Sequence, residues 1–186
     1  MNFVQPIRDP DLIEQIEHYL REKNERDYIL FMLGIYTALR ISDILSLKVQ
    51  DLKGKNSLVI SEKKTRRKKN NRRTIEMHPS LKKALKGFLA DKPDHEYVIK
   101  SRVGKNRPIT RERAYMILNE VAKEFGVDSL GCHSLRKTLG FHLYQQTKDV
   151  VLVQKMLNHE NPSYTLRYIG IEQDEVNNAI TKVRFY

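Results

Sequence analysis

Residues 132–138 read CHSLRKT, a stretch that places His133 and Arg136 three positions apart. Side chains three apart lie on the same face of a helix, so the stretch predicts a helix, beginning near Ser134, with both polar groups on one face. His159 follows Arg136 by 23 residues, in MLNHENPS, and Tyr168 follows His159 by nine, in YTLRYIG. These positions organise the candidate site at the C-terminal end of the chain.

The composition predicts one basic globular domain over residues 1–186. The 186 residues include 34 Lys and Arg against 23 Asp and Glu, a net charge of +11, with 40% hydrophobic and 31% charged residues. A chain of this length forms about one domain with a well-buried core. The positive charge favours a polyanionic partner, and nucleic acid is the commonest, although sign alone does not choose among DNA, RNA and lipid.

The positive charge is concentrated in residues 63–73, KKTRRKKNNRR, which contain eight basic residues and no acid. The flanking segments 57–62 (SLVISE) and 73–77 (RTIEM) are short and β-branched, which predicts a two-stranded hairpin with the basic run as its connection. A run of like charge is often only a solvated loop. We favour contacts with a DNA backbone, made by Lys63, Arg66, Arg67, Lys68, Lys69, Arg72 and Arg73.

Most of the remaining chain is predicted to be helical, giving a mainly α fold with a small antiparallel β-sheet (α+β). Apolar spacing and capping residues predict helices that start at Asp9, after Asn24, at Ser42, at Pro79, at Thr110 (ending at Phe125 before Gly126), near Asp149, at Pro162 and over residues 172–180. Residues 97–99 are predicted as a short strand. Arg40 then lies in a tight corner between two helices.

No targeting or membrane segment is predicted. The longest apolar stretch, residues 28–39, is shorter than the roughly 20 residues that cross a bilayer, and the first residues lack a signal-peptide pattern. Cys132 is the only cysteine, so an intrachain disulfide is excluded and a cytoplasmic location is expected. We interpret Cys132 as a buried thiol, and His18, His78, His95 and His142 as structural or surface residues rather than metal ligands.

The candidate residues suit phosphoryl transfer to a hydroxyl group. The guanidinium groups of Arg40 and Arg136 can stabilise charge on phosphate oxygens without a metal, and a tyrosine hydroxyl can attack phosphorus directly. A lysine on the hairpin can protonate the departing sugar oxygen, and the two histidines can orient the phosphate or accept the tyrosine proton. Exchange of one ester for another requires neither ATP nor another cofactor.

In this order and spacing, the residues resemble the catalytic domain of the tyrosine recombinases, the phage integrase family. The resemblance covers the chain from about Ile7. Arg40 in TALRISD matches the family's first arginine, and Asp43 the acidic residue that braces the site. His133 and Arg136 match its H-x-x-R pair, and His159 its second histidine. Lys64 matches the hairpin lysine best, with Lys63 the near alternative, and Tyr168 has the spacing of the nucleophile. We expect Tyr164, four residues earlier, to pack instead.

The sequence departs from the family pattern in three ways. Ala38 and Asn158 stand where the family often has glycine, and Ala38 disfavours a left-handed turn, so we expect the local turn to differ there. The hairpin connection is unusually charged. The family's separate N-terminal core-binding domain has no counterpart, so we expect one catalytic domain over residues 1–186.

The resemblance implies an enzyme of DNA integration and recombination, typical of mobile elements, that breaks and rejoins double-stranded DNA through a 3′-phosphotyrosyl link to Tyr168. It implies dimers or tetramers on DNA, with accessory DNA-bending proteins as further partners and residues 172–180 near a neighbouring subunit. Two alternatives remain open: a DNA-binding module that does not cut, and a type IB topoisomerase. No metal and no membrane partner are expected.

Overall fold

The computed structural model describes residues 4–61, 72–128, 130–159, 161–171 and 180–183. Within these residues the chain is mainly helical with a two-stranded antiparallel sheet, as the sequence predicts. The order of elements is α1 (Pro10–Lys23), α2 (Glu25–Thr37), α3 (Ile41–Ile44), α4 (Val49–Leu52), β1 (Ser57–Ser61), β2 (Arg72–Glu76), α5 (Pro79–Leu89), α6 (Arg111–Glu124), α7 (Cys132–Thr147), α8 (Val150–Leu157) and α9 (Pro162–Ile169). No helix among the described residues is long and apolar enough to cross a membrane.

Most predicted helix starts are confirmed by their caps. The side chains of Asp9, Asn24, Thr110 and Asp149 each accept a hydrogen bond from a backbone N–H in the first turn of the helix that follows. The predicted helix over residues 172–180 lies outside the described residues, apart from its last position.

Two local predictions are wrong, the cap at Ser42 and the strand at residues 97–99. Ser42 does not cap α3, which begins one residue earlier with Arg40 at the cap position. The helix that carries Arg136 begins at Cys132, within two residues of the predicted start near Ser134, and the Ser134 hydroxyl accepts from the N–H of Gly131 in its first turn. Residues 97–99 form no strand, since only isolated bridges, from Lys48 to Tyr97 and from Lys100 to Pro108, occur there.

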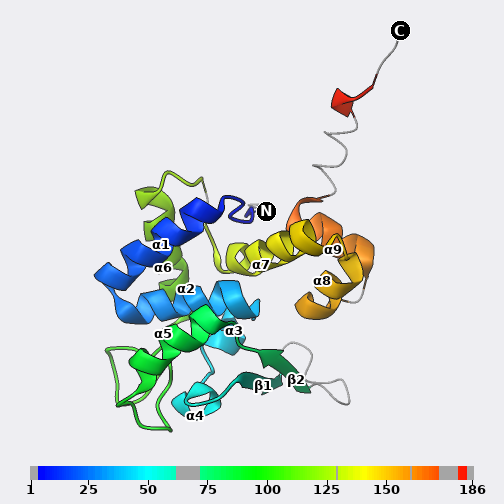
Figure 1. The fold of residues 1–186 in the computed structure, drawn as a ribbon. Coiled ribbons are helices and arrows are strands. Elements are labelled where there is room, and N and C mark those ends of the chain that lie inside the picture. The colour runs from blue at the N-terminus through cyan, green and yellow to red at the C-terminus, as the bar shows by residue number, and fades with distance from the viewer. Residues whose placement is uncertain (1–3, 62–71, 129, 160, 172–179, 184–186) are drawn as a thin grey trace.

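Helix α2 is the central element, and almost all of its residues are buried. It packs against α1, α5 and α7, and these helices surround the larger apolar core (Figure 1). A smaller cluster joins α7, α8 and α9 through Phe141, Val153, Leu157 and Ile169. Because Leu135 of α7 belongs to the larger core and Phe141 to the smaller one, α7 connects the two.

Close packing of α9 on α7 depends on Gly140. A Cβ atom built at Gly140 would lie 2.8 Å from Cγ2 of Ile169 and 3.3 Å from Cδ1 of Leu157. Real Cβ atoms essentially never approach a neighbour as closely as 2.8 Å, so any side chain at Gly140 would push α9 outward. The backbone spacing of α7 and α9 therefore sets the position of every residue on α9, including Tyr168.

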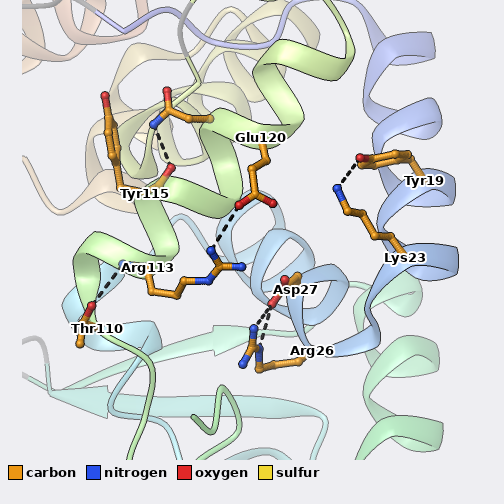
Figure 2. A network of polar contacts seen from close by, with 9 residues as sticks. Tyr19, Lys23, Arg26, Asp27, Thr110, Arg113, Tyr115 and Glu120 are labelled. Atoms are coloured by element: carbon orange, nitrogen blue, oxygen red, sulfur yellow. Dashed lines mark hydrogen bonds and ion pairs between the residues drawn. The ribbon is translucent and has the colours of Figure 1, made fainter. Parts of the chain in front are cut away.

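Polar contacts lie within α2 and α6 and between α2 and the loop after α5. Figure 2 shows the ion pair of Arg26 with Asp27, at 2.7 Å, and that of Arg113 with Glu120, at 3.2 Å. Arg26 also donates to the carbonyl of Lys100, at 3.3 Å, which fastens the loop after α5 to α2. Exposed pairs such as that of Arg113 with Glu120 contribute little to stability individually. The Arg26 bond to Lys100 is the contact that joins two segments.

Candidate active site

Arg136 joins three helices at the centre of the candidate site. Its side chain is almost fully buried, with 2% of its surface exposed. Nη1 donates to the carbonyl of Ala38 at the end of α2, and Nη2 donates to the carbonyl of Leu157 at the end of α8. A guanidinium has five N–H donors in a rigid plane, so these two carbonyls fix that plane.

The backbone at Ala38 differs from expectation in a way that the Arg136 contact explains. Ala38 adopts the left-handed conformation, with φ 50°, although a residue with a Cβ atom disfavours it. Ala38 is fully buried, and its carbonyl accepts from Arg136. The expectation that alanine changes the turn is wrong, because packing and a charged hydrogen bond offset the strain. Asn158, also left-handed at φ 50°, ends α8 as predicted.

Tyr168 and His133 meet across 35 positions of sequence. The Tyr168 hydroxyl on α9 lies 3.2 Å from Nδ1 of His133 in the first turn of α7, and the two rings are nearly perpendicular. His133 is exposed and Tyr168 is half-buried. The pair therefore places an exposed imidazole nitrogen against the phenol of the predicted nucleophile.

His159 packs on another side of the same phenol. Its ring centroid lies 4.8 Å from that of Tyr168, with the planes at 87°. Nδ1 of His159 lies 3.2 Å from the hydroxyl of Thr165, and Nε2 of Gln154 donates to the His159 carbonyl at 3.1 Å. Thr165 is fully buried, so this contact holds the imidazole in place.

Arg40 approaches the site from the corner between α2 and α3. It occupies the cap position of α3, and its carbonyl accepts from the backbone N–H groups of Asp43 and Ile44. Asp43, the predicted bracing residue, is buried on α3, with 1% of its surface exposed.

The surroundings of Tyr168 change its acidity. Burial raises the pKa of the Tyr168 phenol above its ordinary value, while the positive charges of Arg136 and Arg40 act to lower that pKa. Because burial is the larger effect, the phenol is protonated at neutral pH and must lose a proton to react.

Tyr164 competes poorly for the role of nucleophile. Its ring lies 5.1 Å from that of His159 and stacks on Tyr168 at 6.1 Å, so it packs against the site as predicted. It nevertheless remains 58% exposed. The residue near His133 is Tyr168.

The basic run falls largely outside the described residues, and Lys63, Lys64, Arg66, Arg67, Lys68 and Lys69 all belong to that part. Arg72 and Arg73 are described, in β2, where they pair in register with Ser61 and Ile60 of β1. Arg72 is exposed, whereas Arg73 donates from Nη2 to the Met156 carbonyl at 2.8 Å. Since Met156 precedes Leu157, which accepts from Arg136, Arg73 ties the hairpin to the part of α8 that borders the site.

Lys137 is a residue at the site that the sequence reasoning missed. It follows Arg136 directly, yet its side chain is 6% exposed, and Nζ lies 5.1 Å from the centroid of the Tyr168 ring. Burial lowers the pKa of Lys137. Its only sequence signal is its place in CHSLRKT, and adjacent helical residues ordinarily point in different directions.

The remaining histidines and the cysteine lie apart from this chemistry. His142 makes a hydrogen bond with the Ile7 carbonyl at 3.0 Å, and His78 caps α5 by accepting from Ser80. The Cys132 thiol is half-buried, and burial raises its pKa. Among the described residues no three His, Cys, Asp or Glu side chains gather in a way that could hold a metal ion.

Comparison with known proteins identifies the family of this chain. The phage integrase family matches residues 8–175. The chain belongs to that family. A probable integrase/recombinase of Bacillus subtilis, YoeC, is 46% identical over 179 residues, which cover 96% of each chain. The tyrosine recombinase XerC of Staphylococcus epidermidis is 29% identical over 171 residues, which cover 89% of this chain and 55% of XerC. The predicted resemblance to tyrosine recombinases, and with it an enzyme family of DNA recombination, is confirmed.

Solved structures share the fold. The recombinase XerA superposes with a TM-score of 0.74 at 17% identity, covering 100% of this chain and 66% of XerA. The recombinase XerH, bound to its difH substrate after cleavage, superposes with a TM-score of 0.73 at 18% identity, covering 97% of this chain and 54% of XerH. The chain thus spans just over half of XerC and XerH and nearly all of YoeC.

Proposed function

We propose that this chain cleaves and rejoins double-stranded DNA through a 3′-phosphotyrosyl intermediate on Tyr168, without metal or ATP. The observation that carries the proposal is the 3.2 Å separation of the Tyr168 hydroxyl and His133 Nδ1, beside two arginines whose charges act on the same phenol. The names of its relatives, tyrosine recombinase and integrase/recombinase, support the same chemistry.

Each residue has one role in the proposed step. The Tyr168 oxygen forms a bond to the scissile phosphorus while the bond from phosphorus to the 5′ oxygen breaks. His133 receives the phenol proton, and Lys64, or Lys63 in its place, gives a proton to the departing 5′ oxygen. Arg40, Arg136 and His159 stabilise the negative charge on the non-bridging oxygens, with Asp43 bracing the site. Attack by a 5′ hydroxyl of another strand reverses the ester and restores the tyrosine.

The partners proposed are DNA and further copies of this chain. The charge of +11 suits a DNA backbone, and the exposed Arg72, with Lys63, Arg66, Arg67, Lys68 and Lys69, is proposed to contact it. Among the relatives of known structure, XerH is described bound to its substrate and lambda integrase as a dimer on a core site. We propose assembly as dimers or tetramers on DNA, helped by accessory DNA-bending proteins.

The test is covalent trapping on DNA. A duplex pool carries a central 5′-bridging phosphorothiolate between random flanks, so that cleavage releases a thiol that does not reseal the strand. The protein is expected to form an adduct that survives SDS, and sequencing of the adducts gives the target site. Tyr164→Phe should retain the adduct and Tyr168→Phe should lose it. Salt-sensitive binding with no adduct would instead favour a module that only binds, and relaxation of supercoiled plasmid without sequence preference would favour a topoisomerase.

A further inference from the structure

The first described residues of the chain lie against the helices of the candidate site, and we call residues 4–8 the N-terminal strap (Figure 1). The backbone N–H of Ile7 donates to the Thr138 hydroxyl at 2.9 Å, and His142 makes a hydrogen bond with the Ile7 carbonyl at 3.0 Å. The Ile7 side chain is buried, with 4% of its surface exposed. These contacts fix the strap along α7.

The strap touches the site at two places. Its Val4 carbonyl accepts from Nζ of Lys137 at 2.8 Å, and the same Nζ lies 5.1 Å from the centroid of the Tyr168 ring. Arg8 donates to the carbonyl of Gly170, two residues after Tyr168, at 3.4 Å, and its guanidinium lies over the Phe141 ring. The strap therefore contacts the end of the helix that carries Tyr168 directly and the Tyr168 ring only through Lys137.

Core packing alone does not explain a lysine at position 137. Burial lowers the pKa of this ammonium group because removing a charge from water is unfavourable. An apolar side chain of similar length would fill the same space without that cost. The charge instead meets a carbonyl on one side and an aromatic face on another, and an aromatic face attracts a cation.

We propose that the N-terminal strap sets the orientation of the Tyr168 ring through Lys137, which makes Lys137 a positioning residue for the reaction proposed above. The strap positions the Val4 carbonyl, this carbonyl accepts a hydrogen bond from Nζ of Lys137, and Nζ lies over the Tyr168 ring. Any partner or preceding segment that shifts residues 4–8 would thereby change the presentation of the phenol. The inference rests on the proposed function for its consequence but not for its geometry.

The geometry is tested without DNA. We place 3-fluorotyrosine at position 168 of the full chain and record its ¹⁹F resonance. Lys137→Met should shift and broaden the resonance, and Lys137→Arg, which retains the cation, should restore it in part. Lys148→Met is the matched control, because Lys148 also lies on a tyrosine ring, that of Tyr144, at the end of the same helix. An unchanged resonance in Lys137→Met, or an equal change in the control, would overturn the proposal.

The link from strap to ring is tested by a double-mutant cycle. Ile7→Ala loosens the strap without changing Lys137. If the strap acts on the Tyr168 ring only through Lys137, the effect of Ile7→Ala on the resonance should largely vanish in a Lys137→Met background. Additive effects would contradict a path through Lys137. Should Lys137→Met fail to fold, Ile7→Val in the unsubstituted chain still tests whether the strap orients the ring, and an unmoved resonance there would overturn the role of the strap.

The consequence for the reaction is measured separately. Lys137→Met should lower the single-turnover rate of adduct formation by up to about 100-fold, the effect of a misplacement of about 1 Å, and leave the DNA dissociation constant unchanged. A loss of binding with an unchanged rate would overturn the positioning role. If the unsubstituted protein forms no adduct, the proposed function fails, while the ¹⁹F measurement still decides whether Lys137 orients Tyr168.

Discussion

The hydroxyl of Tyr168 lies 3.2 Å from Nδ1 of His133, and burial raises the pKa of that phenol. The distance and the raised pKa are linked through the proton of the phenol. A phenol that is protonated at neutral pH attacks phosphorus only if a neighbouring group accepts its proton, and the imidazole is within reach. His133 is therefore expected to matter most below the pKa of the phenol.

Removal of His133 should expose this dependence on pH. We expect His133→Ala to lower the single-turnover rate of adduct formation at neutral pH by about 10²- to 10⁴-fold, the usual contribution of a general base. The deficit should shrink as pH rises, because more of the phenol is then ionised without help. Rates measured across alkaline pH for both proteins test this, and parallel profiles would contradict the assignment.

The raised pKa also predicts how stability depends on pH. A group with a folded pKa above its unfolded value stabilises the fold below the unfolded pKa, and this contribution is lost as pH rises through the folded pKa. The free energy of unfolding should thus fall above about pH 10, and Tyr168→Phe should reduce that fall. Urea titrations below and above this pH measure it. Tyr36, whose pKa burial also raises, contributes in the same direction, so Tyr36→Phe calibrates the size of the effect.

Arg40→Ala and Arg136→Ala should both reduce cleavage, but only Arg136→Ala should also reduce stability. Loss of either should reduce cleavage by about 10²- to 10³-fold, because each donor to the developing charge is lost, and leave DNA binding mostly intact. Arg136→Ala should also lower the free energy of unfolding by about 3 kcal/mol, because the carbonyls of Ala38 and Leu157 lose their charged donor. Near-normal cleavage by either variant would contradict its role.

The hairpin lysine is identified by changing the leaving group. Lys64→Ala should nearly abolish cleavage of ordinary DNA, because the departing 5′ oxygen needs a proton. The same variant should cleave a 5′-bridging phosphorothiolate at close to the normal rate, since a thiolate leaves without protonation. Lys63→Ala is the matched control on both substrates. If Lys63→Ala rather than Lys64→Ala shows this rescue, the two lysines exchange roles.

Arg72 and Arg73 should differ although they are neighbours in β2. Arg73→Gln weakens the contact with the Met156 carbonyl beside the site, so we expect slower cleavage with little change in binding. Arg72→Gln should weaken DNA binding and reduce the salt slope by about 0.9, the value for one phosphate contact. Binding isotherms at several salt concentrations distinguish the two residues. An equal loss of salt slope in both variants would assign Arg73 to DNA as well.

Gly140 should control where α9 sits. Gly140→Ala forces α9 away from α7 and is expected to cost about 1–3 kcal/mol of stability, because the core is overpacked. Gly87→Ala in α5 is the control, since its new methyl group meets no atom within 4 Å. That control should stabilise the protein by up to about 1 kcal/mol, by helix propensity. Denaturant unfolding measures the stability of both variants. An unchanged free energy of unfolding in Gly140→Ala would show that α9 can shift without loss of stability.

Local chemistry in the sequence determined the elements. Capping side chains such as Asp9 and Thr110, apolar spacing and β-branched runs act over a few residues, so the helices and the hairpin were predictable, and the order of His133, Arg136, His159 and Tyr168 predicted the family. The local rule for Ala38 was wrong, since the buried contact from Arg136 to the Ala38 carbonyl outweighs a backbone preference of about 1–2 kcal/mol. The local rule for Ser42 was also wrong, because the chain enters α3 at Arg40 instead.

Only the tertiary structure decided which groups surround the phenol. Packing of α9 on α7 brings together residues 35 positions apart, and the strap brings Val4 to Lys137 across 133 positions. Such contacts arise because the whole chain buries apolar surface. Burial favours close packing but is not directional, so the local sequence does not show which residues will meet. Lys137 and Arg73 look like ordinary surface cations in the sequence. Their hydrogen bonds inside the protein depend on carbonyls that remote segments place beside them.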